Sequence, residues 1–305
     1  MIRSLVETIA RLKAERNAVI LVHNYQPGEV QDIGDFVGDS LDLSRQAAKT
    51  DAERILFCGV LFMAETAAIL APGKKVYMPD PNAGCPMANM ATPRELAELK
   101  ARHPGARVVT YVNSSAEIKA MSDICCTSAN AVAVVRRFPV DEEILFVPDR
   151  NLGHYVAKEL GRRNIVLWNG CCPTHERILP EHVAEARKAH PHALLVVHPE
   201  CRPAVVDMAD HVGSTGGILR FCRESRAGEF IIGTELGLLY RLEKENPGKR
   251  FYLASPVCDC PNMKLTTLEK VLWCLEDLSG EIRVPKRIAR AALRPIERML
   301  ETAGG

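Results

Sequence analysis

Three of the eleven cysteines in this sequence stand directly before a proline, at nearly even spacing. They are Cys85 in "NAGCPMAN", Cys172 in "GCCPTH" and Cys260 in "CDCPNMK", and the intervals between them are 87 and 88 residues. We expect the chain to be cytoplasmic, where thiols stay reduced, so disulfides are disfavoured. The even interval predicts instead that the three thiols occupy equivalent positions in a repeated unit and bind one metal centre together.

Three converging thiolates suit two kinds of metal centre. One is a zinc site completed by a fourth protein ligand. The other is a [4Fe–4S] cluster, one per chain, in which three irons take cysteine and the fourth is open. Zinc sites usually show close pairs such as C-x-x-C, and the nearest pattern here is the C-x-C of Cys258 and Cys260. Widely separated cysteines, each followed by proline, favour the cluster.

The other cysteines have no counterpart at the same period, and we expect them to be core thiols that pack as small apolar side chains. Cys171 and Cys258 are the expected spare thiols near the metal. The full set is Cys58, Cys125, Cys126, Cys171, Cys201, Cys222, Cys258 and Cys274.

A second series with the same period consists of polar residues at the ends of apolar runs. His23 ends "NAVILVHNY", Tyr111 ends "GARVVTYVN" and His198 ends "HALLVVHPE", at intervals of 88 and 87 residues. Residues two apart in a strand face the same way, so each end offers a second side chain on the same side. These second side chains are Tyr25, Asn113 and Glu200. A set of histidine, tyrosine and glutamate suits proton transfer.

A third series consists of hydroxyl residues ahead of helical patterns. Ser40, Ser128 and Ser214 are 88 and 86 residues apart, and each follows its strand end by 16 or 17 residues. Each is an expected N-cap of a helix. Helix N-termini also bind anions through their free N–H groups, so three of them facing one cavity would bind a small polyanion.

The segments between these positions alternate short strands with helices. "VVTYV", "ILFV" and "IVLW" are typical of buried parallel strands, and "PRELAELKARH", "PEHVAEARKAH" and "TLEKVLWCLEDL" are typical of helices. This alternation predicts an α/β fold with parallel sheets covered by helices. Ligands of such sheets bind beyond the carboxyl ends of the strands, where His23, Tyr111 and His198 are predicted to lie.

The three series together predict three related α/β/α three-layer units around a pseudo-threefold axis. We place them at residues 1–103 with an N-terminal helix, at 104–190, and at 191–305 with C-terminal helices. Such an arrangement would point the carboxyl ends of three parallel sheets at one central cavity.

Charge and the N-terminal segment disfavour several classes of protein. The chain has 305 residues and a net charge of +1, which gives no support for nucleic-acid binding. The segment "MIRSLVETIARLKAERN" places apolar side chains at helical spacing with charges between them, unlike a signal peptide. No apolar run approaches the roughly 18 residues of a membrane span. We therefore expect a cytoplasmic protein with no membrane or nucleic-acid partner.

Several longer motifs resemble those of the quinolinate synthase family. They are "HNYQ", "VQDIGDFVGDSLDLSR", "YVNSSAEIKAMSDICCTSANAV", "FVPDRNLG", "HPEC", "VGSTGGI", "IGTELGL" and "CPNMK", spread over nearly the whole chain. The resemblance implies an enzyme of de novo NAD biosynthesis that condenses iminosuccinate with dihydroxyacetone phosphate to give quinolinate, phosphate and water. It also implies three α/β/α domains about a pseudo-threefold axis and a [4Fe–4S] cluster on three cysteines.

The resemblance also assigns roles to residues of this sequence. Cys85, Cys172 and Cys260 would be the cluster ligands, and the open iron would act as a Lewis acid. Tyr25 and Glu200 would lead the acid–base chemistry, and His23, Tyr111 and His198 would also be catalytic. The residues that would line the substrate site are His23, Ser40, Tyr111, Asn113, Ser128, His198, Glu200, Ser214 and Thr215.

Two alternative functions stay open at this point. One is another Fe–S hydro-lyase acting on a small carboxylic acid, which product analysis with dihydroxyacetone phosphate would distinguish. The other is a zinc-stabilised metabolite-binding protein without catalysis, which would be colourless. A transient contact with the enzyme that produces iminosuccinate is a further expectation from the resemblance.

Overall fold

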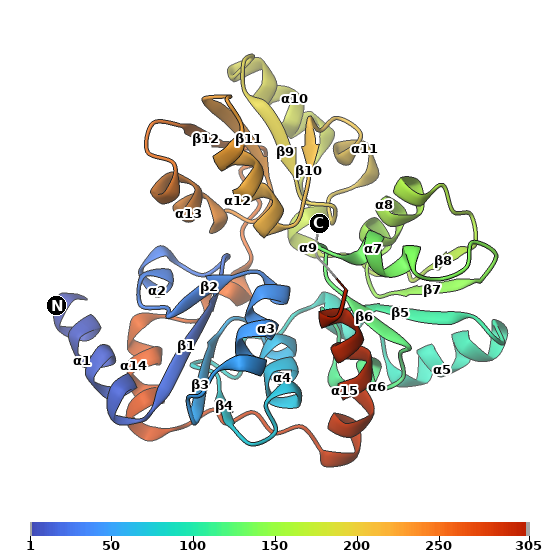
Figure 1. Ribbon diagram of the computed structural model, residues 1–305. Coiled ribbons are helices and arrows are strands. Elements are labelled where there is room, and N and C mark those ends of the chain that lie inside the picture. The colour runs from blue at the N-terminus through green and yellow to red at the C-terminus, as the bar shows by residue number, and fades with distance from the viewer. Residues whose placement is uncertain (1, 303–305) are drawn as a thin grey trace.

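A computed structural model describes residues 2–302 and contains three four-stranded sheets, in which every pair of named strands is parallel (Figure 1). The strand order is the same in all three, with the second strand of each unit at one edge: β2-β1-β3-β4, β6-β5-β7-β8 and β10-β9-β11-β12. The strands are β1 (Ala18–His23), β2 (Phe36–Gly38), β3 (Arg54–Cys58), β4 (Lys75–Tyr77), β5 (Arg107–Tyr111), β6 (Ile124–Cys126), β7 (Ile144–Val147), β8 (Ile165–Leu167), β9 (Leu194–Val197), β10 (His211–Val212), β11 (Glu229–Gly233) and β12 (Arg250–Leu253).

Helices connect and cover these strands. They are α1 (Ile2–Glu15), α2 (Gly28–Asp32), α3 (Ser40–Lys49), α4 (Leu61–Leu70), α5 (Pro93–Arg102), α6 (Ala116–Ala120), α7 (Ala131–Arg136), α8 (Arg150–Leu160), α9 (Pro173–Glu176), α10 (Pro180–Ala189), α11 (Pro203–Val206), α12 (Thr215–Glu224), α13 (Leu238–Glu245), α14 (Leu268–Asp277) and α15 (Lys286–Leu300), with short 3-10 helices η1 (Met87–Met90) and η2 (Pro261–Lys264). None of those described is long and apolar enough to cross a membrane.

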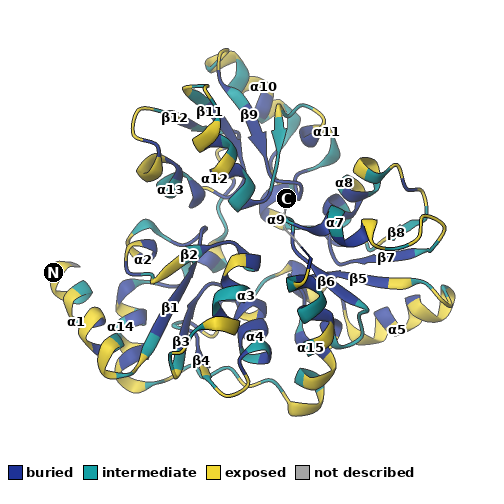
Figure 2. Cartoon of the chain, in the orientation of Figure 1, coloured by how far each residue is buried: buried dark blue, intermediate teal, exposed yellow. Residues whose placement is uncertain are grey.

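This architecture confirms the predicted fold class. Each sheet falls within one of the predicted ranges, and Figure 1 shows the three sheets arranged around a common centre. The exact limits of the units stay a prediction. The strands carry the core: β-branched and aliphatic side chains on both faces of β1, β5 and β9 are buried, as expected for parallel strands covered on both sides (Figure 2).

Three aspartates show that the units are equivalent in detail. Asp35, Asp123 and Asp210 each accept a hydrogen bond from a backbone N–H of the first strand of their sheet, at 2.8, 2.8 and 2.7 Å. Each carboxylate also pairs with a cation, Lys13, Arg107 or Arg187 respectively. Their intervals are 88 and 87 residues, so this series was visible in the sequence as well.

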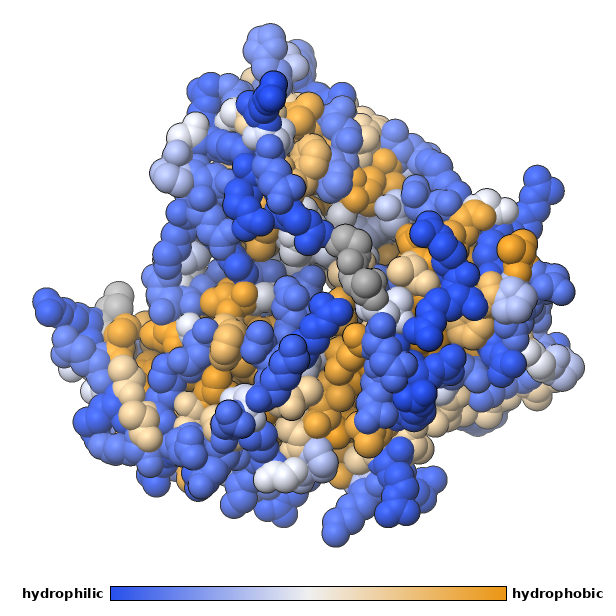
Figure 3. Space-filling model, in the orientation of Figure 1, coloured by the Kyte–Doolittle hydropathy of each residue, from blue (hydrophilic) through white to orange (hydrophobic). Residues whose placement is uncertain are grey.

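The C-terminal helices return to the beginning of the chain. Helix α14 packs beside α1, where Leu268, Val271 and Leu275 join Ile9 and Leu12 in one apolar cluster. Helix α15 packs against α4, α6 and β6, which come from the first two units. The segment that follows the third sheet thus packs mainly on elements of the first two units. The outward faces of the helices are exposed, and most of the surface seen in Figure 3 is hydrophilic.

Candidate active site

The carboxyl ends of the three sheets meet at a central cavity of about 320 Å³. Its wall includes residues of all three units, as the sequence predicted. The predicted site residues that line it are His23, Tyr25, Ser40, Cys85, Tyr111, Asn113, Ser128, Cys172, His198, Glu200, Thr215 and Cys260. Ser214 instead lines a neighbouring groove between α7 and α12, which shares Ser128 with the cavity.

The three Cys-Pro thiols share one local geometry. Each cysteine precedes a short helical turn, η1, α9 or η2, whose first residues include or follow the proline. Backbone N–H groups of these turns donate to the sulfurs: those of Met87 and Ala88 to Cys85, that of His175 to Cys172, and those of Asn262 and Met263 to Cys260. Such contacts stabilise a thiolate, because the donors compensate its negative charge.

This donor set fits an iron–sulfur cluster. Burial raises the pKa of all three thiols above the ordinary value, so they are neutral until a metal replaces their protons. Three thiols on one wall, each with backbone donors on its sulfur, are the arrangement that cluster sites use. Cys171, the neighbour of Cys172, is not among the cavity residues.

The first and third strand ends hold their histidines in the same way. Nδ1 of His23 accepts the backbone N–H of Tyr25 at 3.1 Å, and Nδ1 of His198 accepts that of Glu200 at 3.3 Å. A ring whose Nδ1 accepts carries its proton on Nε2 when it is neutral. Nε2 of His198 therefore donates to the Ser128 hydroxyl, 3.1 Å away in the second unit.

A hydrogen-bonded chain connects Tyr25 to Glu200 through two residues that the sequence analysis did not select. The Tyr25 hydroxyl lies 2.6 Å from Oγ1 of Thr234, which lies 2.9 Å from Nε2 of His175. Nδ1 of His175 lies 2.9 Å from Oε2 of Glu200 and 3.2 Å from Sγ of Cys172. His175 and Thr234 are fully buried. His175 was detectable as the residue one helical turn after Cys172, and Thr234 as the residue after the apolar run "EFIIG".

Burial sets the protonation of this wall. It lowers the pKa of His23 and of His198 to about 3, and it raises the pKa of Tyr25 and Tyr111 well above the ordinary value. Burial alone would raise the pKa of Glu200, but His175, His198 and the Tyr111 hydroxyl lower it to about 2. At neutral pH this wall thus presents neutral imidazoles at His23 and His198, neutral phenols at Tyr25 and Tyr111, and an ionised carboxylate at Glu200.

Two buried oxygens of this wall lack a partner among the described residues. They are Oε1 of Glu200 and Oδ1 of Asn113. Buried polar atoms are almost always hydrogen-bonded, so unpaired ones in a cavity wall indicate where a bound molecule or water supplies the missing donor.

The expected N-caps are only partly present. Ser214 caps α12, since its Oγ accepts the N–H of Gly217 at 3.1 Å. The prediction was wrong for Ser40 and Ser128: Asp39 is the cap of α3, with Ser40 as the first helical residue, and α7 begins after Asn130. Asp39 is the N-cap in place of the serine because its carboxylate accepts two backbone N–H groups of the first helical turn, those of Leu41 and Asp42, at 3.0 Å each.

The stability of the cluster-free protein should fall as the pH drops below about 6.5. The folded state keeps His23 and His198 neutral down to a pKa of about 3, whereas the unfolded chain protonates them near 6.5. The unfolded state therefore binds more protons, and each histidine costs about 1.4 kcal/mol per pH unit well below pH 6.5. His198→Gln should reduce the slope of unfolding free energy against pH by about that amount, measured by urea denaturation between pH 4 and 7. Parallel curves would contradict this.

Residues 7–301 match the family model of the quinolinate synthetase A protein. The quinolinate synthase of Thermodesulfovibrio yellowstonii is 55% identical over 300 residues, 98% of this chain and 99% of the relative. That of Geotalea uraniireducens is 58% identical over 292 residues (96% and 95%), and that of Geobacter metallireducens is 57% identical over 294 residues (96% of each). The similarity therefore extends over all three units.

Proposed function

We propose roles for the residues of this cavity in one reaction. The premise is that the chain belongs to the quinolinate synthetase A family. Its activity is that of a quinolinate synthase, the condensation of iminosuccinate with dihydroxyacetone phosphate in NAD biosynthesis. Membership of this family implies an iron–sulfur cluster. The assignment of individual residues to the cluster and to the reaction is our proposal, and the observation that carries it is the convergence of three equivalent thiols and three strand ends on one cavity.

Cys85, Cys172 and Cys260 would hold a [4Fe–4S] cluster. When bound, such a cluster with one open iron supplies a Lewis acid that polarises a carbonyl or hydroxyl oxygen. The support is chemical: these are the three thiols in the cavity wall, and each has backbone donors on its sulfur.

The substrates carry two carboxylates and one phosphate, and the cavity offers matching donors. The hydroxyls of Ser40, Ser128 and Thr215 and the amide of Asn113 face it. Helix α12 also begins at its edge, and the partial positive charge of its first turn favours an anion, whereas the first turn of α3 is already capped by the Asp39 carboxylate. Arg177 lies in the same wall and adds a full positive charge. These groups would bind and orient the substrates.

Glu200 and Tyr25 would exchange protons with the substrates. Glu200 is ionised, and its unpaired Oε1 would accept a proton. Tyr25 keeps its proton, and its hydroxyl would donate it, with Thr234 and His175 able to return one along the chain of hydrogen bonds. His198, held by the Glu200 N–H, would present Nε2–H to the Ser128 oxygen, and His23 and Tyr111 would complete the wall around the reacting atoms.

Two further assignments accompany this function. We propose a cytoplasmic location and one central active site shared by units at about 1–103, 104–190 and 191–305. We also predict a transient contact with the enzyme that produces iminosuccinate. Such a contact would shorten the path of an unstable substrate.

Anaerobic purification followed by metal and product analysis tests the proposal. We expect about four irons and four sulfides per chain, a brown colour, and quinolinate from iminosuccinate and dihydroxyacetone phosphate. One zinc and no iron would contradict the cluster assignment. A full cluster without quinolinate would instead favour another hydro-lyase.

A further inference from the structure

Two buried carboxylates hold the backbone of two cluster-ligand candidates. Oδ2 of Asp149 accepts the N–H of Cys172 at 3.1 Å, and Oε1 of Glu235 accepts the N–H of Cys260 at 3.0 Å. Both carboxylates are fully buried. Neither was selected from the sequence, and the chemistry proposed above does not use them.

These two carboxylates occupy the same position in their units. Asp149 follows the end of β7 by two residues, and Glu235 follows the end of β11 by two residues. The equivalent position after β3 in the first unit is Val60, an apolar side chain in the cavity wall. A buried carboxylate therefore precedes the ligand loop in the second and third units, whereas the first unit has a valine at this position.

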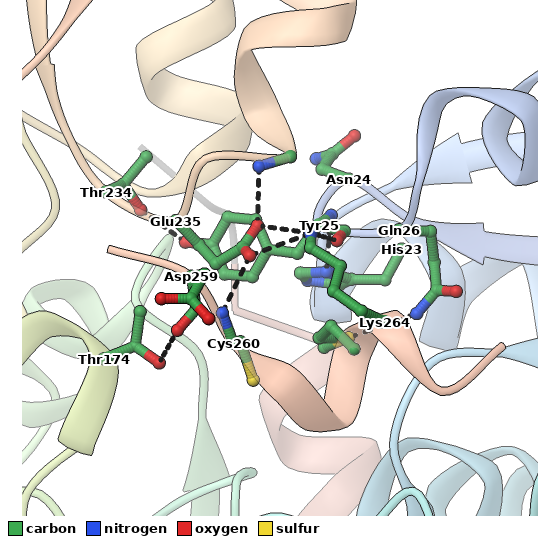
Figure 4. Close-up of polar contacts among 12 residues, drawn as sticks. His23, Asn24, Tyr25, Gln26, Thr174, Thr234, Glu235, Asp259, Cys260 and Lys264 are labelled. Carbon is green, nitrogen blue, oxygen red and sulfur yellow. Dashed lines mark hydrogen bonds and ion pairs between the residues drawn. The ribbon is translucent and has the colours of Figure 1, made fainter. Parts of the chain in front are cut away.

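Each carboxylate uses its second oxygen to anchor itself. Oδ1 of Asp149 caps helix α8 through the N–H of Leu152, at 2.7 Å. Oε2 of Glu235 accepts the N–H of Gly237, also at 2.7 Å. The carboxylates thus connect the end of a central strand to a ligand loop, as Figure 4 shows for Glu235 and Cys260.

Lys264 extends the Glu235 contact to the first unit. Its Nζ lies 2.8 Å from Oε1 of Glu235 and donates to the backbone oxygen of Tyr25 at 2.5 Å (Figure 4). A side chain at Gly237 would not fit here, because a Cβ would lie 2.6 Å from the Tyr25 oxygen. Glu235 therefore fixes the Cys260 loop relative to the strand end that carries Tyr25.

We propose that Asp149 and Glu235 are positioning residues for the cluster, which hold Cys172 and Cys260 at the ends of β7 and β11 through their backbone N–H groups. This inference rests on the proposed ligand set. Both oxygens of each carboxylate accept an N–H, so an amide cannot replace it: one oxygen becomes an NH₂ group that faces another donor. Such an unpaired buried donor destabilises the position of the ligand loop.

Loss of the cluster to a chelator tests this role without reference to activity. In anaerobically reconstituted protein, we expect Asp149→Asn and Glu235→Gln each to lose the visible absorption of the cluster about tenfold faster than the unchanged chain. Glu235→Asp keeps the charge but shortens the side chain by one methylene. This variant should lose the visible absorption of the cluster at least about fivefold faster than the unchanged chain. Thermal melting of the cluster-free variants, followed by circular dichroism, should stay cooperative, because the side-chain oxygen of the asparagine in Asp149→Asn can still cap α8.

Asp123→Asn and Asp210→Asn are matched controls. They neutralise carboxylates that also accept a backbone N–H beside a cation, in the second and third units, but at the amino ends of the strands. We expect them to lose the cluster within about twofold of the unchanged rate. The proposal would be overturned if Asp149→Asn and Glu235→Gln lost the cluster at the same rate as the two controls, whether that common rate is slow or fast. An unchanged rate in Glu235→Asp would also overturn it. If the unchanged chain binds no cluster at all, the ligand assignment itself fails, which is a separate result.

Discussion

Cys172→Ala is expected to give a colourless protein that forms no detectable quinolinate, whereas Cys171→Ala keeps both the cluster and the activity. Of the two neighbouring thiols, only Cys172 lies in the cavity wall, and only Cys172 is in register with Cys85 and Cys260. Its sulfur receives the N–H of His175, and its own N–H is held by Asp149. Removing one of three ligands leaves an iron of the cluster without its protein thiolate.

Iron and sulfide analysis with an absorption spectrum, after identical anaerobic preparation of both variants, measures this difference. Turnover of Cys172→Ala should fall by at least about a thousandfold, since the chemistry loses its Lewis acid. Circular dichroism checks that the variant is folded, which we expect because the side chain is small, lines the cavity and is only partly buried. A brown Cys172→Ala together with a colourless Cys171→Ala would show that the neighbouring thiol is the ligand.

The spacing of a few residue types predicted the architecture because the chain repeats itself. Three Cys-Pro pairs and three strand ends at about the same period predicted three units around one common centre, and the sheets have that arrangement. The Asp35, Asp123 and Asp210 series has the same period and was overlooked, because isolated aspartates ahead of strands are also common in loops.

The parts of the site that sequence did not predict are those where the units differ. Asp149 and Glu235 have Val60 as their counterpart, so no threefold series marks them. His175 and Thr234 connect Tyr25 to Glu200 in one hydrogen-bonded chain with residues from all three units, and such contacts depend on how the units face each other rather than on a motif. The serine N-cap of α3 failed for a related reason, because a neighbouring aspartate in this unit accepts the N–H groups that the serine would have capped.

Glu200→Gln is expected to keep the cluster and to lose turnover by about a hundred- to ten-thousandfold, the range that a general acid or base contributes. The amide has nearly the same shape, so packing around the buried side chain should persist. It cannot accept a proton, and it removes the one carboxylate of the cavity wall that lies beside His175. The loss should appear equally in kcat and in kcat/KM, because the carboxylate accepts the proton in the transition state and does not contribute to binding of the substrate in the ground state.

Steady-state kinetics on anaerobic protein with measured iron content checks this, and Glu176→Gln is the matched control. Glu176 lies in the same helical turn as His175 and pairs with Arg150 at 2.8 Å, but it is outside the cavity wall. Its neutralisation should leave turnover within about twofold. If Glu200→Gln turned over normally, the proton would have to go elsewhere, and the remaining candidates beside this carboxylate are His175 and His198. A raised KM with unchanged kcat would instead place Glu200 among the residues that bind the substrate before and during the reaction alike.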